Sequence, residues 1–280
     1  MGSISNFLEC KFLDHVCNTA YSPSATIYLG LCTADPTDAA TGAACNEVPD
    51  AGAYARKAIT FGGVASRKVT QDALVTFTKA TDVWGHVSHW VVVNSITYGA
   101  GDVLAFGEFT VHKDIVLNNT PSVASGQVYV EYTAGEISDY LVGKLLELAF
   151  RNVAYSKPAT YVAFCTSVVV DADTTLAGKE VTNAGAYARK LVNINGGASP
   201  TWDFAVASDP SYVDNTHAIT FTPASADWSA GVPIVAVAIC DNGTWNSVNM
   251  LFYDNTMADQ PVQNGDTADF AIGVLDLQMS

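Results

Sequence analysis

The chain has 280 residues, of which 49% are hydrophobic and 15% are charged, and its formal net charge at pH 7 is −15. A charge of this sign disfavours electrostatic binding to a nucleic-acid backbone or to an anionic membrane surface. No apolar run is long enough for a membrane-spanning helix, and Glu9, Lys11 and Asp14 interrupt any signal-peptide core. We therefore expect neither a nucleic acid nor a membrane among its partners.

One seven-residue segment occurs twice. Residues 51–57 read Ala-Gly-Ala-Tyr-Ala-Arg-Lys, and residues 184–190 repeat them letter for letter, at an offset of 133 in the numbering (184 − 51). Trp84 and Trp228 belong to a second matching segment with an offset of 144 (228 − 84), so the second copy has gained eleven residues in between (144 − 133). A repeated identity of this length indicates an internal duplication.

The duplication predicts two homologous domains, residues 1–133 and 134–280, joined too closely for a flexible linker. Each copy opens with apolar residues at helical spacing, starting at Ile4 in the first copy and at Ile137 in the second. Such a stripe predicts an amphipathic helix with one buried face at the start of each domain.

The remainder of each copy alternates segments rich in β-branched and aromatic residues with Gly, Asn and Asp turns, a pattern that predicts strands. Residues 87–93 and 234–239 are almost continuously apolar, as expected of a central strand that is buried on both faces. We predict a mainly β protein of two antiparallel β-sandwich (jelly-roll-like) domains, each with an N-terminal amphipathic helix. The predicted strands are 26–32, 56–61, 73–78, 87–94, 103–110 and 127–132, followed by 160–165, 189–194, 218–222, 234–241, 250–253 and 266–277.

The six cysteines show no Cys-x-x-Cys spacing. Cys10 and Cys17 are separated by about 10 Å of helix rise, which exceeds the reach of a disulfide. Cys32 and Cys165 are related by the repeat and lie in apolar strands. We predict that most cysteines are reduced and buried, as in a protein made in a reducing cytoplasm.

The repeated segment is interpreted as a turn and an anchor behind a long loop. Glycine permits the turn, the tyrosine is expected to be half-buried with its hydroxyl bonded to the backbone, and the arginine is expected to bind a carboxylate or loop carbonyls. A ligand site built on tyrosine and arginine is the alternative. The residues of this structural signature are Gly52, Tyr54, Arg56 and Trp84 in the first copy and Gly185, Tyr187, Arg189 and Trp228 in the second.

Acidic residues gather in the loop that precedes each signature. They could bind Ca²⁺, but they lack the spacing of an EF-hand loop, and turn formation is the simpler interpretation of Asp-Pro-Thr-Asp. Because the loops differ while the signatures are identical, we expect any difference in function between the copies to lie in the loops. The candidate interaction residues are Asp35, Asp38, Glu47 and Asp50 in the first copy and Asp171 and Asp173 in the second.

No nucleophile elbow, P-loop, dinucleotide fingerprint or zinc-protease motif occurs in the sequence. His86 and His89 have a spacing that suggests a metal pair, but residues three apart on a strand point to opposite faces. Ala230 and Pro233 stand at the corresponding positions of the second copy. We predict no catalytic residue, no cofactor and no metal site.

Three segments of the first copy resemble a group of tailed-bacteriophage structural proteins. They are Tyr-Leu-Gly-Leu-Cys-Thr-Ala-Asp-Pro-Thr at 28–37, Gly-Ala-Tyr-Ala-Arg at 52–56 and Phe-Thr-Lys-Ala-Thr-Asp-Val-Trp-Gly at 77–85. The second copy keeps the last two but reads Thr-Ser-Val-Val at 166–169 in place of Thr-Ala-Asp-Pro. The resemblance implies a non-enzymatic virion protein with a β-sandwich fold, present in many copies or as an oligomer. Its partners would be other virion proteins, such as the major capsid protein or tail proteins.

Within that class, a compact, acidic tandem without a low-complexity shaft favours a capsid decoration or cement protein on the outer surface of the head. A tail or tail-fibre component that contacts the host surface is the first alternative. The second is a carbohydrate-binding module that would hold a host-surface glycan on Trp90, Trp202 or Trp245. Each alternative places the protein in the virion or on its surface, after assembly in the host cytoplasm.

Overall fold

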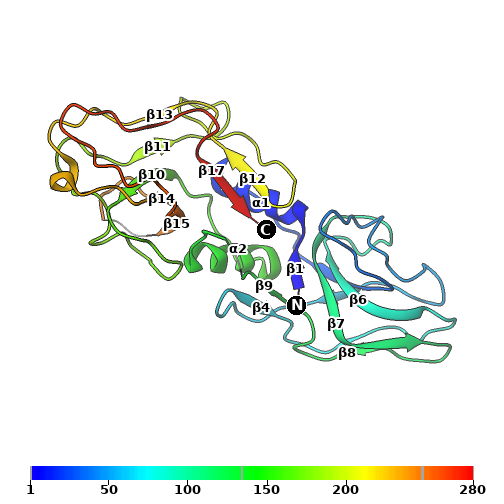
Figure 1. The fold of residues 1–280 in the computed structure, drawn as a ribbon. Coiled ribbons are helices and arrows are strands. Elements are labelled where there is room, and N and C mark those ends of the chain that lie inside the picture. The colour runs from blue at the N-terminus through cyan, green and yellow to red at the C-terminus, as the bar shows by residue number, and fades with distance from the viewer. Residues whose placement is uncertain (1, 134, 247–248, 280) are drawn as a thin grey trace.

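The computed structural model describes residues 2–133, 135–246 and 249–279 (Figure 1). The predicted fold class is confirmed: the protein is mainly β, its strand ladders are antiparallel, and the described residues include two α-helices. All six cysteines are free thiols, and five of them are buried. Figure 1 shows two β-rich lobes, one for each copy, with both helices between them.

Each copy contains one main sheet, and the two sheets are built alike. The strands of the first follow the spatial order β1 (Gly2–Ile4), β7 (Val103–Ile115), β6 (Gly85–Val93), β2 (Ile27–Cys32) and β3 (Lys57–Ile59). Those of the second follow the order β11 (Lys190–Val192), β10 (Thr160–Cys165), β14 (Ala236–Cys240) and β15 (Met250–Asp254). As predicted from their apolar runs, β6 and β14 are interior strands with buried residues on both faces.

Short two-stranded ladders pack on one face of each main sheet. The first copy has β4 (Lys68–Thr70) with β9 (Tyr129–Glu131) and β5 (Val75–Thr76) with β8 (Ser122–Val123). The second has β12 (Ser211–Asp214) with β17 (Asp276–Met279) and β13 (Ile219–Thr220) with β16 (Asp269–Phe270). Leu29 of β2, Val69 of β4 and Val75 of β5 belong to one core, so sheet and ladders face each other across apolar side chains.

The long loop of each copy covers the opposite face of its main sheet. In the first copy Ala40 and Cys45 of the loop pack with Cys32, Val91 and Val93 of the sheet. In the second copy Val169 and Leu176 pack in the same way against β10 and β14. Both faces of each sheet are therefore buried, which explains why its central strands do not alternate between apolar and polar residues.

Each helix begins two residues later than its apolar stripe suggests (6 − 4 and 139 − 137). In α1 (Asn6–Cys17) and α2 (Asp139–Arg151) the capping residues are Ser5 and Ser138, whose hydroxyls accept from backbone N–H groups three residues on, at 3.3 and 3.2 Å. Ile4 therefore lies in β1, and Ile137 lies in a bridge opposite Phe252. Including these two isoleucines in the helices was wrong. The N-cap serine that follows each of them has extended backbone angles, so the helix begins only after that serine.

Each helix packs on a ladder of the other copy. The α1 helix contacts β12 and β17 of the second copy, and α2 contacts β4 of the first. Each also contacts a strand of its own main sheet, β7 for α1 and β15 for α2. The two copies therefore exchange helices across the joint, an arrangement that the repeat pattern did not predict.

Polar contacts fix this joint on both sides. The second copy binds α1 and its C-cap residue, since the Ala205 N–H donates to Asp14 Oδ1 at 3.0 Å and the Asn195 N–H donates to Asn18 Oδ1 at 2.9 Å. On the other side the Val64 N–H donates to Glu147 Oε1 of α2 at 3.0 Å. The copies are thus held in one relation rather than joined by a loose linker.

Candidate functional site

The signature begins with a tight turn that requires glycine. Gly52 and Ala53 both have left-handed backbone angles, with φ of 59° and 62°. A Cβ on Gly52 would lie 2.9 Å from the Cβ of Asp82 and 3.0 Å from Nε1 of Trp84. The Trp84 indole N–H donates to the Gly52 carbonyl at 2.9 Å. The pairing of glycine and tryptophan in both copies thus reflects one hydrogen-bonded turn.

The second copy repeats the turn. Gly185 and Ala186 have φ of 61° and 64°. The Trp228 indole N–H donates to the Gly185 carbonyl at 2.8 Å. A Cβ on Gly185 would lie 2.8 Å from the carbonyl oxygen of Ala226.

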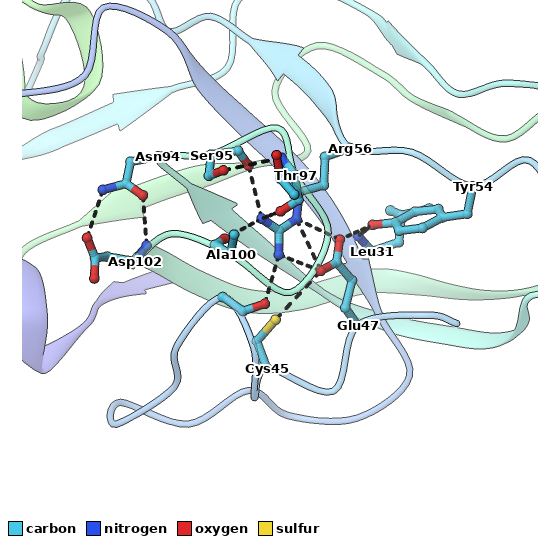
Figure 2. Close-up of polar contacts among 11 residues, drawn as sticks. Leu31, Cys45, Glu47, Tyr54, Arg56, Asn94, Ser95, Thr97, Ala100 and Asp102 are labelled. Carbon is cyan, nitrogen blue, oxygen red and sulfur yellow. Dashed lines mark hydrogen bonds and ion pairs between the residues drawn. The ribbon is translucent and has the colours of Figure 1, made fainter. Parts of the chain in front are cut away.

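A buried Glu–Tyr–Arg cluster follows the turn (Figure 2). The Tyr54 hydroxyl donates to Glu47 Oε1 at 2.6 Å and accepts from the Leu31 N–H at 2.9 Å. Arg56 holds both oxygens of the Glu47 carboxylate, with Nε–Oε1 at 2.9 Å and Nη2–Oε2 at 2.7 Å. Tyr54 is only 6% exposed, so it is more deeply buried than the sequence suggested.

The remaining Arg56 donors bind backbone carbonyls of two loops. Nη1 donates to Ser95, Thr97 and Ala100 at 3.0, 2.9 and 2.8 Å, and all three lie in the turn between β6 and β7. Nη2 also donates to Gly42 of the long loop at 2.9 Å. One guanidinium thus ties together the long loop and this turn, as the dashed lines of Figure 2 show.

Glu180, Tyr187 and Arg189 form the same cluster in the second copy. The Tyr187 hydroxyl donates to Glu180 Oε1 and accepts from the Phe164 N–H, both at 3.0 Å. Arg189 holds the carboxylate through Nε and Nη2, each at 2.8 Å, and donates from Nη1 to the Asn242 carbonyl at 2.7 Å. The two glutamates have the same offset of 133 in the numbering (180 − 47) as the signature itself.

The charges of the cluster neutralise one another. Burial lowers the pKa of Arg56, but the hydrogen bonds and charge of Glu47 outweigh it, so the pKa of the guanidinium lies above its usual value. Burial, and then the charge of Glu47, raises the pKa of the Tyr54 hydroxyl far above its ordinary range. The arginine therefore stays charged and the tyrosine neutral at physiological pH, and the cluster anchors the loop.

The acidic loop residues do not gather into one site. The Glu47 side chain is 3% exposed and belongs to the anchor, so its assignment as an interaction residue is corrected. Asp171 is paired with Arg67 at 2.9 Å, and Asp173 is paired with Lys179. Figure 2 shows Glu47 pointing inward at Arg56.

The other three candidate residues belong to the loop of the first copy. Asp35 and Asp50 are exposed and Asp38 is half-buried. Asp35 accepts the Thr37 N–H at 3.1 Å, the turn contact that the sequence favoured over Ca²⁺ binding. Within the described ranges no three His, Cys, Asp or Glu side chains are grouped to hold a metal ion.

The strand argument that separated His86 from His89 was wrong. The register of β6 against β7 shifts between Val87 and His89, so the alternation of faces is interrupted there. Both rings consequently lie beside His112, with ring centroids 5.5 and 6.4 Å from it. His86 is hydrogen-bonded to Asp114 at 2.8 Å.

The three tryptophans proposed for glycan binding have different environments. Trp90 and Trp202 are 1% and 0% exposed and belong to the core. Trp245 is 38% exposed, and its indole N–H donates to the Val181 carbonyl at 2.8 Å. The structure therefore removes two of the three aromatic platforms from consideration.

Comparison with known proteins identifies the class of protein to which this β-rich tandem belongs. A family profile described as podophage GP4 fiber I protein gp80 matches residues 3–131 and, a second time, residues 136–278. The protein is a structural protein of a phage virion, tail-fibre-like and built as a tandem duplication. The chain belongs to the family of the podophage GP4 fiber I protein gp80. No curated protein matches it significantly. Neither helix of the described chain is long and apolar enough to cross a membrane.

Proposed function

We propose that the chain is a non-enzymatic fibre component of a tailed-phage virion that binds other virion proteins. The observation that carries this proposal is the double match to the fibre I protein, which takes in both copies. The family resemblance seen in the sequence points to the same class of particle. A structural component of a particle must keep its shape, and the fixed joint between the copies suits that task.

The use of the repeated polar residues supports the non-enzymatic part of the proposal. Glu47, Tyr54 and Arg56 are engaged with one another and with loop carbonyls, and the second copy repeats the arrangement. An acid, base or nucleophile needs a reactive group that can reach a substrate. These residues instead hold the long loops on the main sheets.

Copy number and position in the particle test the placement. We expect cryo-EM of the virion, with quantitative mass spectrometry of its proteins, to place a few or a dozen copies on the tail. Hundreds of copies on the head would instead establish the capsid decoration role that the composition favoured. Hydrolysis of a polysaccharide by the purified protein would contradict the non-enzymatic role.

A further inference from the structure

A cavity of about 460 Å³ opens in the second copy, between β14 and β15 of the main sheet and the β16 and β17 strands of the ladders. Its volume lies within the roughly 300–1,000 Å³ that is typical of ligand pockets. Figure 1 shows β14, β15 and β17 in the lobe of the second copy, with β17 beside α1 at the joint. The apolar part of its wall includes Val237, Ile239, Phe252, Phe270 and Leu277.

The first copy fills the equivalent space with an indole. Leu31 of β2 lies opposite Trp90, and Phe164, its equivalent at the same offset of 133 (164 − 31), lies opposite Val237. Val237 therefore stands where the first copy has Trp90. Trp90 is fully buried, and its ring would lie 2.5 Å from a Cβ on Gly2. The second copy therefore has a small side chain at the wall of the cavity where the first copy has a large one.

The same alignment of the two copies identifies positions at which the second copy has an acidic residue and the first has none. Asp254 lies opposite Val237, as Gly107 lies opposite Trp90. Asp276 takes the place of Tyr129, by the pairing of the short ladders. Two positions that are uncharged in the first copy are thus aspartates in the second, and both residues belong to the lining of the cavity, with Asp276 at its exposed rim.

Glu136 adds a third carboxylate at the joint. Partial burial raises its pKa, and the charges of Asp254 and Asp276 raise it further. No ion pair involves any of them within the described ranges. Arg67 also acts on Tyr253 at the cavity wall, but it is already paired with Asp139 and Asp171.

We propose that this cavity binds a lysine or arginine side chain of another protein chain, with the aliphatic stem on the apolar wall and the cationic head among the three carboxylates. Such side chains bury their methylene groups against apolar surface while the charge remains at a polar rim. The aromatic ring of Phe252 offers a further contact for a cation. The proposal concerns binding alone and does not depend on whether the protein lies on the tail or the head.

Titration of the full-length protein with capped amino acids tests the ligand class. Nα-acetyl-lysine methylamide and Nα-acetyl-arginine methylamide are the probes, followed by NMR of the aromatic resonances of the cavity. The norleucine analogue, which lacks the charge, should bind at least about tenfold more weakly, because a hydrogen bond to a charged group is lost. Equal binding of norleucine overturns the proposal. Tighter binding of free cadaverine than of capped lysine overturns the choice of a protein side chain.

Three variants of the full chain test the location. Val237→Trp refills the cavity with the side chain of the first copy and should abolish binding. The double variant Asp254→Asn/Asp276→Asn should weaken lysine binding at least about tenfold, since it removes two charge-assisted contacts. The matched control is Asp35→Asn/Asp50→Asn, which makes the same change of charge on the exposed loop of the first copy.

The two double variants give a clear decision because both change partly or fully exposed side chains. The control should bind lysine as the parent protein does. If it loses as much affinity as the cavity variant, general electrostatic attraction explains the binding and the proposal is overturned. Parent-like binding by the Asp254→Asn/Asp276→Asn variant overturns it as well.

Discussion

Arg56 shows how one residue holds in place a loop whose sequence differs between the two copies. It forms a two-point ion pair with Glu47 in the interior and also binds carbonyls of two loops. Arg56→Met would leave the Glu47 carboxylate buried without its partner, so we expect the free energy of unfolding to fall by about 3–5 kcal/mol. Urea denaturation measures the change. A loss below about 1 kcal/mol, the range of exposed pairs, would contradict the buried pair.

Gly52 tests whether the turn itself requires glycine. Gly52→Ala and Gly196→Ala both place an alanine at positive φ, 59° and 76°, but only at Gly52 would the new Cβ meet other atoms. Both changes carry the left-handed penalty of about 1 kcal/mol. We expect Gly52→Ala to lose at least about 1 kcal/mol more stability than its control, because the added methyl group must displace Asp82 or Trp84. Equal losses in thermal or urea unfolding would mean that the contacts with Asp82 and Trp84 relax freely.

Glu9 of α1 gives a pH-dependent prediction. Its side chain is almost fully buried at the contact with β12, and desolvation raises its pKa from 4.5 to about 7, against a smaller opposing effect of the Ser211 hydroxyl. The folded protein therefore favours protonated Glu9. The folded protein binds the Glu9 proton more tightly than the unfolded chain does. The stability that results is fully present below pH 4.5 and is lost as the pH rises to about 7.

Glu9→Gln removes this dependence while keeping the shape of the side chain. At pH 8 we expect the variant to be more stable than the parent protein by up to about 3 kcal/mol, and at pH 4 we expect little difference. Urea denaturation at the two pH values measures both. A variant that gains nothing at pH 8 would show that the ionised carboxylate is hydrated in the folded protein.

Among the helices and strands, the sequence predicts those with a long apolar pattern. It misses the short strands that form only by pairing with residues far along the chain. The helices and the strands β2, β6, β10 and β14 follow from apolar patterns, because those segments are long and buried. The ladder strands β4, β8 and β12 are two to four residues long and show no periodicity, since their pairing depends on partners far along the chain. The faces of His86 and His89 likewise depend on β7, whose register against β6 shifts there.

The anchor is partly predictable for a related reason. Exact repetition singles out glycine, tyrosine and arginine, but the glutamate that pairs with the arginine lies in the loop that diverges. Only its offset of 133 between the two copies (180 − 47) marks it as part of the same device. The carbonyls that Arg56 binds carry no side-chain signature at all. The cavity of the second copy needs the strand register, which aligns Val237 with Trp90, before it can be recognised.

At the scale of the whole molecule, the exchange of helices changes what the folding unit is. Residues 1–133 contain α1 but lack β12 and β17, on which it packs. Residues 134–280 contain α2 but lack β4. Each half alone would therefore expose helix and ladder surface that is buried in the intact chain. We propose that the two sequence repeats fold as one cooperative unit rather than as two independent domains.

Expressing the halves separately and together tests this proposal. Each exposed helix face and ladder loses burial worth about 25 cal/mol per Å² of apolar surface. We expect either half alone to aggregate or to self-associate. The two repeats are alike, so the helix of one molecule of a half can pack on the ladder of another molecule of the same half. Co-expression should recover a 1:1 complex by size-exclusion chromatography with light scattering. Two halves that are separately monomeric, with cooperative unfolding transitions of their own, would show that each repeat completes its core without the exchanged helix.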